Sequence, residues 1–287
     1  MHTHLDCIPC FLHQSLEAAR MATTDERKHE EVMKKVMNHL QTIDYTRSPP
    51  EISQKVHHII RSVTANIDPY KQVKQKANEQ AKKQYPTLKN MVKQSKDPLL
   101  MAVKMAIIGN VIDYGTMNRI NVKDMIENIA HKPFIDSDYE DFKQRVSEAK
   151  SIVFLADNTG EIFFDRLLLE QLQKKDCKIT YVVKQYPIIN DATKEDALYA
   201  GIDAYADIIA GDKDAAYSAP GLVPLNISKE LKKLLEDSDV VISKGQGNYE
   251  SLSDFDREIF FLLMVKCPLV AHNIGIEKGT MVLKVST

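Results

Sequence analysis

The residues with the clearest chemistry lie at positions 152–165, which read I-V-F-L-A-D-N-T-G-E-I-F-F-D. The apolar run predicts a buried strand of a parallel sheet, and Asp157 and Asn158 follow where that strand must end. Ligands of open α/β sheets bind outside the carboxyl ends of strands, and a carboxylate beside an amide suits a hard divalent cation. Asn158 and Glu161 are also typical of a helix start, as a cap and as a partner of the helix dipole. Both interpretations of this stretch are open on its sequence alone.

Asp191 is the candidate for a third metal ligand. It lies in the sequence N-D-A-T, in a loop after the second predicted strand. Alone it would be interpreted as a helix-capping aspartate. Beside Asp157 and Asn158 it would supply a third oxygen and leave positions on the cation open for a phosphate.

An anion-binding candidate follows a later strand, in the sequence K-G-Q-G-N at positions 244–248. A lysine beside two glycines is suited to hold an anion with nearby backbone amides, so we expect Lys244, Gly245 and Asn248 to bind substrate. The Walker A spacing is absent, which excludes a P-loop nucleotide triphosphatase. The Rossmann G-x-G-x-x-G is interrupted at Glu250, which counts against a dinucleotide oxidoreductase.

Asn110 and Asp113 lie in an apolar helical segment that begins at Pro98. They are spaced i, i+3 and share a face, and polar groups in so apolar a helix need partners. They bond a neighbouring loop in one interpretation. In the other they face a cleft, where Asn110 binds substrate and Asp113, like Glu161, orients a water molecule.

The elements that must position these residues alternate regularly after residue 136. Strands are predicted at 152–156, 179–183, 206–210, 240–243, 269–271 and 281–285, with helices at 140–149, 161–174, 194–200, 228–236 and 256–264. Residues 11–130 are predicted to be helical, with a lysine-rich helix that starts at Pro69 and ends before Pro86. The predicted strand ends bring several polar residues to one edge: Asp157, Asn158, Lys184, Asp212, Lys244 and Asn273.

The motif C-I-P-C at Cys7 and Cys10 allows three interpretations. Both cysteines pack one face of a helix, or they bind zinc with nearby histidines, or they are redox-active. No second C-x-x-C completes a zinc set, and no βαβ unit follows as in thioredoxin.

Composition is ordinary for a soluble globular protein, at 44% hydrophobic and 27% charged residues with a net charge of −2. No apolar run approaches the roughly 20 residues that span a bilayer, so we expect a cytoplasmic protein without a membrane partner. The lysines between Lys71 and Lys96 are interleaved with no arginine and with a single aromatic, Tyr85, which favours a solvated helix face over a nucleic-acid site.

Five motifs in sequence order carry a resemblance: C-x-x-C, I-G-N-V-I-D, D-N-T-G-E, K-x-x-P-I-I-N-D-A-T and S-K-G-Q-G-N-Y-E. Over essentially its whole length the chain resembles the damage-control metal-dependent phosphatases, in the subfamily that bears an N-terminal C-x-x-C. The resemblance implies a Rossmann-like α-β-α sandwich with a mostly parallel sheet, at residues 136–287. It also implies an all-helical N-terminal domain, at residues 1–135.

The resemblance further implies hydrolysis of phosphate monoesters with Mg²⁺, Mn²⁺, Co²⁺ or Ni²⁺. By similarity, Asp157, Asn158 and Asp191 would hold the metal and Lys244 would contact the phosphate. The substrates would be small phosphorylated metabolites, such as damaged or surplus sugar phosphates or nucleotide-related compounds. Because Thr159 stands where a second acid would follow Asp157, we expect water rather than Asp157 to be the nucleophile. The alternatives are a non-catalytic phosphometabolite sensor and a zinc- or redox-responsive regulator that acts through Cys7 and Cys10.

Overall fold

The computed structural model describes residues 1–109, 133–173, 176–214 and 218–286. Within these residues, seven strands form one sheet in the order β1-β7-β6-β5-β2-β3-β4. Neighbouring strands run parallel except for β6 and β7, which are antiparallel. The strands are β1 (Phe134–Ile135), β2 (Ser151–Leu155), β3 (Lys178–Val183), β4 (Asp207–Ala210), β5 (Val240–Lys244), β6 (Phe260–Met264) and β7 (Met281–Val285).

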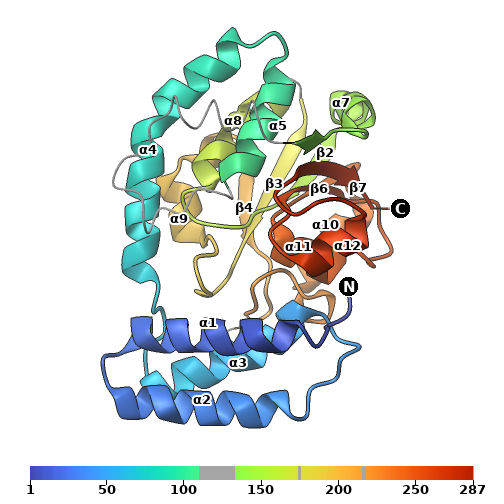
Figure 1. Cartoon of the computed structure of the whole chain (residues 1–287). Helices are drawn as coiled ribbons and strands as arrows, with labels where there is room; N and C mark the ends of the chain where they lie inside the picture. Colours follow the sequence, from blue (N-terminus) through green and yellow to red (C-terminus); the bar gives the residue numbers. More distant parts are fainter. Residues whose placement is uncertain (110–132, 174–175, 215–217, 287) are drawn as a thin grey trace.

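Helices cover both faces of the sheet, which gives the predicted three-layer α/β sandwich (Figure 1). Side chains alternate along each strand, so Ile152 and Phe154 of β2 face one helical layer while Val153 and Leu155 face the other. The first layer holds α4 (Lys71–Gln94), α5 (Pro98–Gly109), α7 (Tyr139–Glu148), α8 (Ile162–Leu172) and α9 (Lys194–Tyr199). The second holds α10 (Lys229–Asp237), α11 (Gln246–Leu252) and α12 (Pro268–Ile274).

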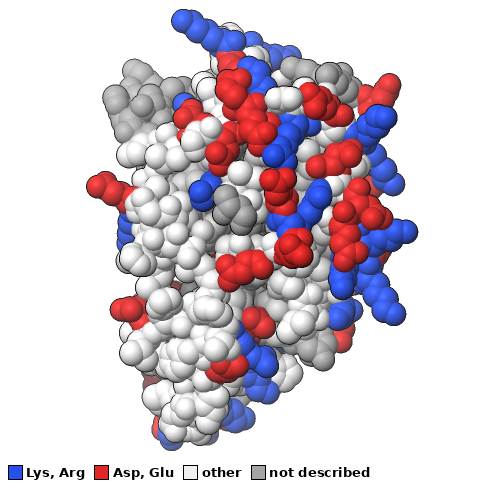
Figure 2. Space-filling view, turned by 90° about the vertical axis from the view of Figure 1, so that its right-hand side faces the viewer, with Lys and Arg blue, Asp and Glu red and all other residues white. Residues whose placement is uncertain are grey.

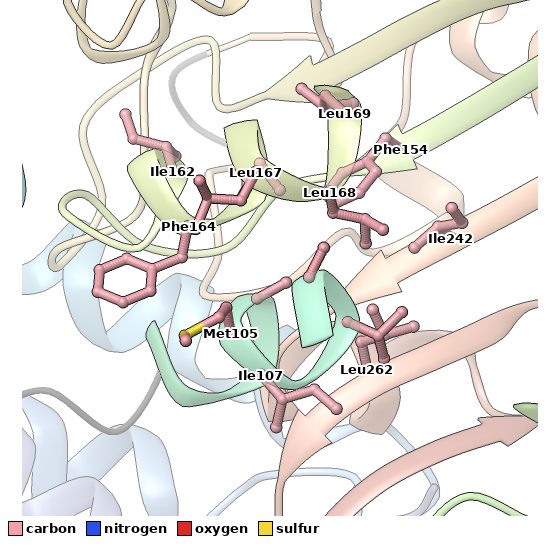
Figure 3. Close-up of a cluster of buried hydrophobic side chains, with 14 of the residues drawn as sticks. Met105, Ile107, Phe154, Ile162, Phe164, Leu167, Leu168, Leu169, Ile242 and Leu262 are labelled. Atoms are coloured by element: carbon pink, nitrogen blue, oxygen red, sulfur yellow. The ribbon is translucent and has the colours of Figure 1, made fainter. Parts of the chain in front are cut away.

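The apolar helix α5 packs on α8 at the centre of the larger core. Figure 3 shows Met105 and Ile107 of α5 in one cluster with Phe164 and Leu168 of α8 and with Phe154 and Leu262 from the strands. The division into a helical domain at residues 1–135 and an α/β domain at residues 136–287 stays a prediction. Helices α4 and α5, which precede residue 135, share their hydrophobic core with the sandwich.

Three helices form a separate layer at one end of the molecule, visible below the sheet in Figure 1. They are α1 (Cys7–Ala22), α2 (Glu26–Leu40) and α3 (Pro49–Thr64), and they enclose a core of their own. The helix α3 begins with a capping box of Ser48 and Glu51, with proline in its first turn. Helix α3 also contacts α11, which joins this layer to the sandwich.

The lysine-rich helix α4 continues through Pro86, so the predicted end before this proline is wrong. A proline inside a helix removes one backbone hydrogen bond and crowds the preceding turn. The helix persists because Leu88 and Val92, which follow the proline, are buried in the core of the sandwich. Pro86 itself lies on the exposed side.

Two further predictions are wrong near the carboxyl end of the chain. The predicted helix at 256–264 is strand β6 from Phe260, because five consecutive buried apolar residues pair with β5 and β7. The predicted strand at 269–271 belongs to helix α12, which has Pro268 in its first turn and Gly275 as a left-handed cap. Asn273 therefore lies in α12 rather than at a strand end.

Positively and negatively charged side chains are interspersed on the face that Figure 2 shows. None of the helices that the structure describes is both long enough and apolar enough to cross a membrane.

Candidate metal centre

Two loops at the carboxyl edge of the sheet bring the three predicted metal ligands together. The backbone amide of Ala192 donates to the carbonyl oxygen of Asp157 at 2.8 Å. The amide of Thr159 donates to the carbonyl oxygen of Asn190 at 2.9 Å, and Asn158 and Asp191 form an isolated antiparallel bridge. Backbone hydrogen bonds thus join the loop after β2 to the loop after β3, with Asp157, Asn158 and Asp191 at adjoining positions. We name these two loops, which carry the predicted ligands, the metal loops.

The side chain of Asn158 is oriented by carboxylates. Its Nδ2 donates to Asp157 Oδ2 at 2.7 Å and to Glu161 Oε2 at 3.2 Å. Because the amide nitrogen is directed at two acidic groups, the amide oxygen is the atom that can ligate a cation. This arrangement fits the donor set of a hard divalent cation, which prefers carboxylate and amide oxygens.

The electrostatics of the site also fit a bound cation. Burial raises the pKa of Asp157 well above its usual range, and the nearby carboxylates of Glu161 and Asp191 raise it further. Burial raises the pKa of Asp191 to about 7, where Lys184 partly offsets the effect and Asp212 adds to it. Crowded, desolvated carboxylates favour either protons or a metal ion, and a divalent cation would restore their charged form.

A cavity of about 710 Å³ opens onto these residues from the junction between the three-helix layer and the sandwich. Asp157, Asn158 and Asp191 form part of its wall, and Lys266 is the lysine that lines it. Helices α1 and α3 contribute five apolar or sulfur-containing residues to the lining, Cys7, Cys10, Phe11, Pro49 and Pro50, together with the polar residues Gln14 and Ser53. The volume lies within the usual range for sites that bind small molecules.

Lys244 does not lie in this cavity. Its side chain has no exposed surface, and its Nζ contacts Glu161 Oε1 at 2.5 Å and Asp165 Oδ1 at 2.6 Å. Burial lowers the pKa of Lys244, but Asp165 and Glu161 outweigh this and raise it overall. The ammonium group already serves two carboxylates, so its position does not fit the predicted direct contact with phosphate. It neutralises the acidic groups beneath the metal loop.

Gly245 and Asn248, which follow Lys244 and were also predicted to bind substrate, stabilise the course of the backbone in this structure. Asn248 is buried, with Nδ2 donating to the carbonyls of Ala156 and Lys244 and Oδ1 accepting from the amide of Leu222. Its amide is therefore fully engaged, which does not fit a substrate contact. Gly245 has a φ of +81°, and a Cβ atom there would lie 1.9 Å from Asp157 Oδ2. The glycine lets β5 approach the metal loop closely.

Asn110 and Asp113, the remaining predicted site residues, lie outside the described residues. The roles predicted for them stay predictions.

Lys184 and Asp212 support the site, although the sequence indicated only their place at strand ends. The Nζ of Lys184 donates to the carbonyl of Gly221 at 2.6 Å. It also lies 3.9 Å from Asp191 Oδ2 and 3.7 Å from Asp212 Oδ1. All three side chains are buried, so this lysine stabilises the carboxylate of Asp191 by its charge.

Cys7 and Cys10 both line the cavity, although they differ in exposure. Cys7 is buried and burial raises the pKa of its thiol, whereas Cys10 is exposed. Among the described residues, no group of three or more His, Cys, Asp or Glu side chains is arranged to hold a metal ion. The predicted set at Asp157, Asn158 and Asp191 is of another kind, because one member is an amide.

Comparison with known proteins gives matches along nearly the whole chain. The family model of the ARMT1-like damage-control phosphatase domain matches residues 3–282. A damage-control phosphatase of Archaeoglobus fulgidus is 34% identical over 97% of each chain, and one of Pyrococcus horikoshii is 33% identical over 98% of this chain and 97% of its own. The crystal structure of a DUF89 family protein from Pyrococcus horikoshii superposes with a TM-score of 0.88 at 29% identity, and covers both chains fully.

Proposed function

This chain belongs to the ARMT1-like damage-control phosphatase family, and we propose that it is a divalent-metal-dependent phosphatase that hydrolyses phosphate monoesters of small metabolites. The observation that carries the proposal is the pair of loops after β2 and β3, which backbone hydrogen bonds join. They place two carboxylates and an amide oxygen at the wall of a cavity of about 710 Å³. The substrates would be damaged or surplus sugar phosphates or nucleotide-related compounds; two relatives carry the name damage-control phosphatase, which supports the phosphatase activity.

Asp157, Asn158 and Asp191 would hold the cation, which would be Mg²⁺, Mn²⁺, Co²⁺ or Ni²⁺. When bound, such a cation neutralises charge on phosphate oxygens and orients the ester. Glu161 fixes the amide of Asn158, and Lys244 forms ion pairs with both Glu161 and Asp165 below it. The carboxylate pair and the lysine thus orient the ligands without touching the substrate.

Lys266 takes the place that the sequence suggested for Lys244. It lines the cavity together with Asp157, and its charge lowers the pKa of that carboxyl against the raising effect of burial. A lysine facing the same space as the ligands can hold a second phosphate oxygen. The apolar residues that α1 and α3 contribute to the lining would then receive the organic part of the ester.

Water is the nucleophile in this proposal. Thr159 stands two residues after Asp157, and its hydroxyl donates to the backbone carbonyl of Asn190 at 3.1 Å. It therefore holds the loop together and offers no second acid to the reaction. Hydrolysis in one step needs only a water molecule aligned with the ester bond, opposite the leaving oxygen.

The test is hydrolysis of an aryl phosphate by metal-stripped protein, with each of the four cations and Zn²⁺ added back. We expect metal-dependent turnover that Asp157→Ala abolishes, with an unchanged thermal unfolding midpoint or a raised one. Asp207→Ala is the matched control, because Asp207 is an exposed aspartate of the same sheet. A folded protein that binds a cation but hydrolyses no ester would instead be a sensor of phosphometabolites.

A further inference from the structure

Helix α4 reaches the metal centre through one buried amide. Asn78 lies in the middle of α4 and is 4% exposed, between the buried residues Ala77 and Ala81. In Figure 1, α4 runs from the three-helix layer along the side of the sandwich, past α9 and α8. Its sequence separation from the metal loops is large, since Gly160 lies 82 positions later.

The amide of Asn78 bonds directly to the loop of Asp157 and Asn158, and it reaches the loop of Asp191 through Asp196 of α9. Its Oδ1 accepts from the backbone amide of Gly160 at 2.7 Å, two residues after Asn158. Its Nδ2 donates to Asp196 Oδ1 at 2.8 Å. The other oxygen of Asp196 accepts from the backbone amide and the hydroxyl of Thr193, two residues after Asp191.

This pattern needs a side chain that both accepts and donates. The amide of Gly160 is buried, and a buried amide without a partner is costly. An aspartate at position 78 could satisfy Gly160 but would oppose the carboxylate of Asp196. An alanine would leave both polar groups without their partner, so the two loops would lose their common anchor.

We propose that Asn78 is a positioning residue of the metal centre, which fixes the loop of Asp157 and Asn158 relative to the loop of Asp191. The proposal rests on the proposed function only in placing the cation at these three residues. Outer residues that orient ligands commonly change metal affinity by about 10–100-fold when they are replaced. The effect on metal affinity is therefore separable from turnover.

The experiment measures the affinity of the full-length protein for Mn²⁺ by electron paramagnetic resonance of the free ion. We expect Asn78→Ala and Asn78→Asp to bind Mn²⁺ about 10–100-fold more weakly than the wild type. The double variant Asn78→Asp with Asp196→Asn exchanges donor and acceptor and restores every hydrogen bond of the network. It should recover affinity to within about twofold of the wild type, the usual error of additivity.

Two controls keep the test decisive. Asn90→Ala removes an exposed amide from the same helix and should leave Mn²⁺ affinity unchanged. Asp196→Asn alone is a milder change that should also weaken binding, and it serves if the Asn78 variants do not fold. Thermal unfolding is followed for each variant.

Folded Asn78 or Asp196 variants that bind Mn²⁺ as the wild type does would overturn the positioning role and leave the phosphatase standing. A double variant that stays as weak as Asn78→Asp would also overturn it. Wild-type protein whose Mn²⁺ affinity depends on Asn78 but which hydrolyses no phosphate ester would refute the proposed function alone. Wild-type protein that binds no Mn²⁺ would refute both.

Discussion

Replacement of Lys244 by methionine tests the buried charge cluster beneath the metal loop. The change keeps an unbranched side chain but removes the ammonium group that contacts Glu161 and Asp165. Both carboxylates are fully buried, and in the variant Asp165 would keep the hydrogen bond from the hydroxyl of Tyr181, at 2.7 Å. The variant therefore leaves two acidic groups in the core without their cation.

Breaking a buried ion pair by removing one partner costs about 3–5 kcal/mol of unfolding free energy. For a chain of this length, each kcal/mol corresponds to about 2–3 °C in the thermal midpoint, so we expect a drop of about 6–15 °C. The drop in the thermal midpoint should lie at the lower end of this range if Glu161 or Asp165 takes up a proton, because a neutral carboxylic acid needs no neighbouring cation.

The loss should depend on pH in a defined direction. Burial raises the pKa of Asp165 to about 6 in the folded wild type, even though Lys244 opposes that rise. Without Lys244 the folded pKa rises further, above the unfolded value of about 4. A raised folded pKa stabilises the protein fully below the unfolded pKa, and this stability is lost as the pH rises through the folded pKa. The variant should therefore approach the wild type near pH 5 and fall furthest behind it near pH 8.

Thermal or urea unfolding at pH 5 and pH 8 measures both expectations. Lys178→Met is the matched control, since Lys178 is an exposed lysine whose ion pair with Asp207 is solvated on both sides. Exposed pairs contribute little, so this control should unfold close to the wild type at either pH. A Lys244→Met variant that matches Lys178→Met, or whose loss is the same at both pH values, would refute the assignment of Lys244 as the neutralising cation.

Two further predictions concern the walls of the site. Gly245→Ala should weaken Mn²⁺ binding as well as lower stability, because the new Cβ would meet the carboxylate of Asp157; Gly279→Ala is the control, with a similar positive φ but open space around it. Calorimetric titration with Mn²⁺ distinguishes the two variants. Equal Mn²⁺ affinities for Gly245→Ala and Gly279→Ala would show that the close approach of Gly245 to Asp157 is unimportant for binding. Lys266→Ala should raise KM for an aryl phosphate about tenfold with a smaller change in kcat, as expected for one lost charged hydrogen bond. Steady-state kinetics measures this effect, with Lys278→Ala as the control because Lys278 is an exposed lysine. An unchanged KM in Lys266→Ala would show that Lys266 does not bind the phosphate.

The sequence correctly placed Asp157 and Asn158 at the carboxyl edge of the sheet because two local signals agreed there. A continuous apolar run predicted β2 as a buried parallel strand, and the polar pair after it had to lie at the carboxyl edge. The strands β3, β5 and β7 were predicted for the same reason. The run at 260–264 was misassigned because an apolar stretch of that length fits a buried helix as well as a strand.

The role of Lys244 was harder to predict, although its partners left a trace in the sequence. Alternation along β5 places Lys244 on the same side as Ile242, toward the layer that contains α8. Glu161 and Asp165 are spaced i, i+4, so they share the face of α8 that meets this side. Strand polarity indicated which edge Lys244 approaches, but only the packing of α8 on the sheet shows that two acids occupy its ammonium group.

Asn78 shows where sequence patterns stop being informative about a site. Its helix carries an ordinary charged face, and nothing near it in sequence suggests a ligand. The proposed role of Asn78 arises only because α4 crosses from the three-helix layer to the sandwich, where its amide contacts Gly160 and Asp196. In our proposal the metal centre is built from the sheet edge and fixed from outside it, while α1 and α3 would contact the organic part of a substrate. Changes in α1 and α3 would then alter which ester is accepted without disturbing the ligands, whereas changes at Asn78 of α4 would alter the affinity for the cation.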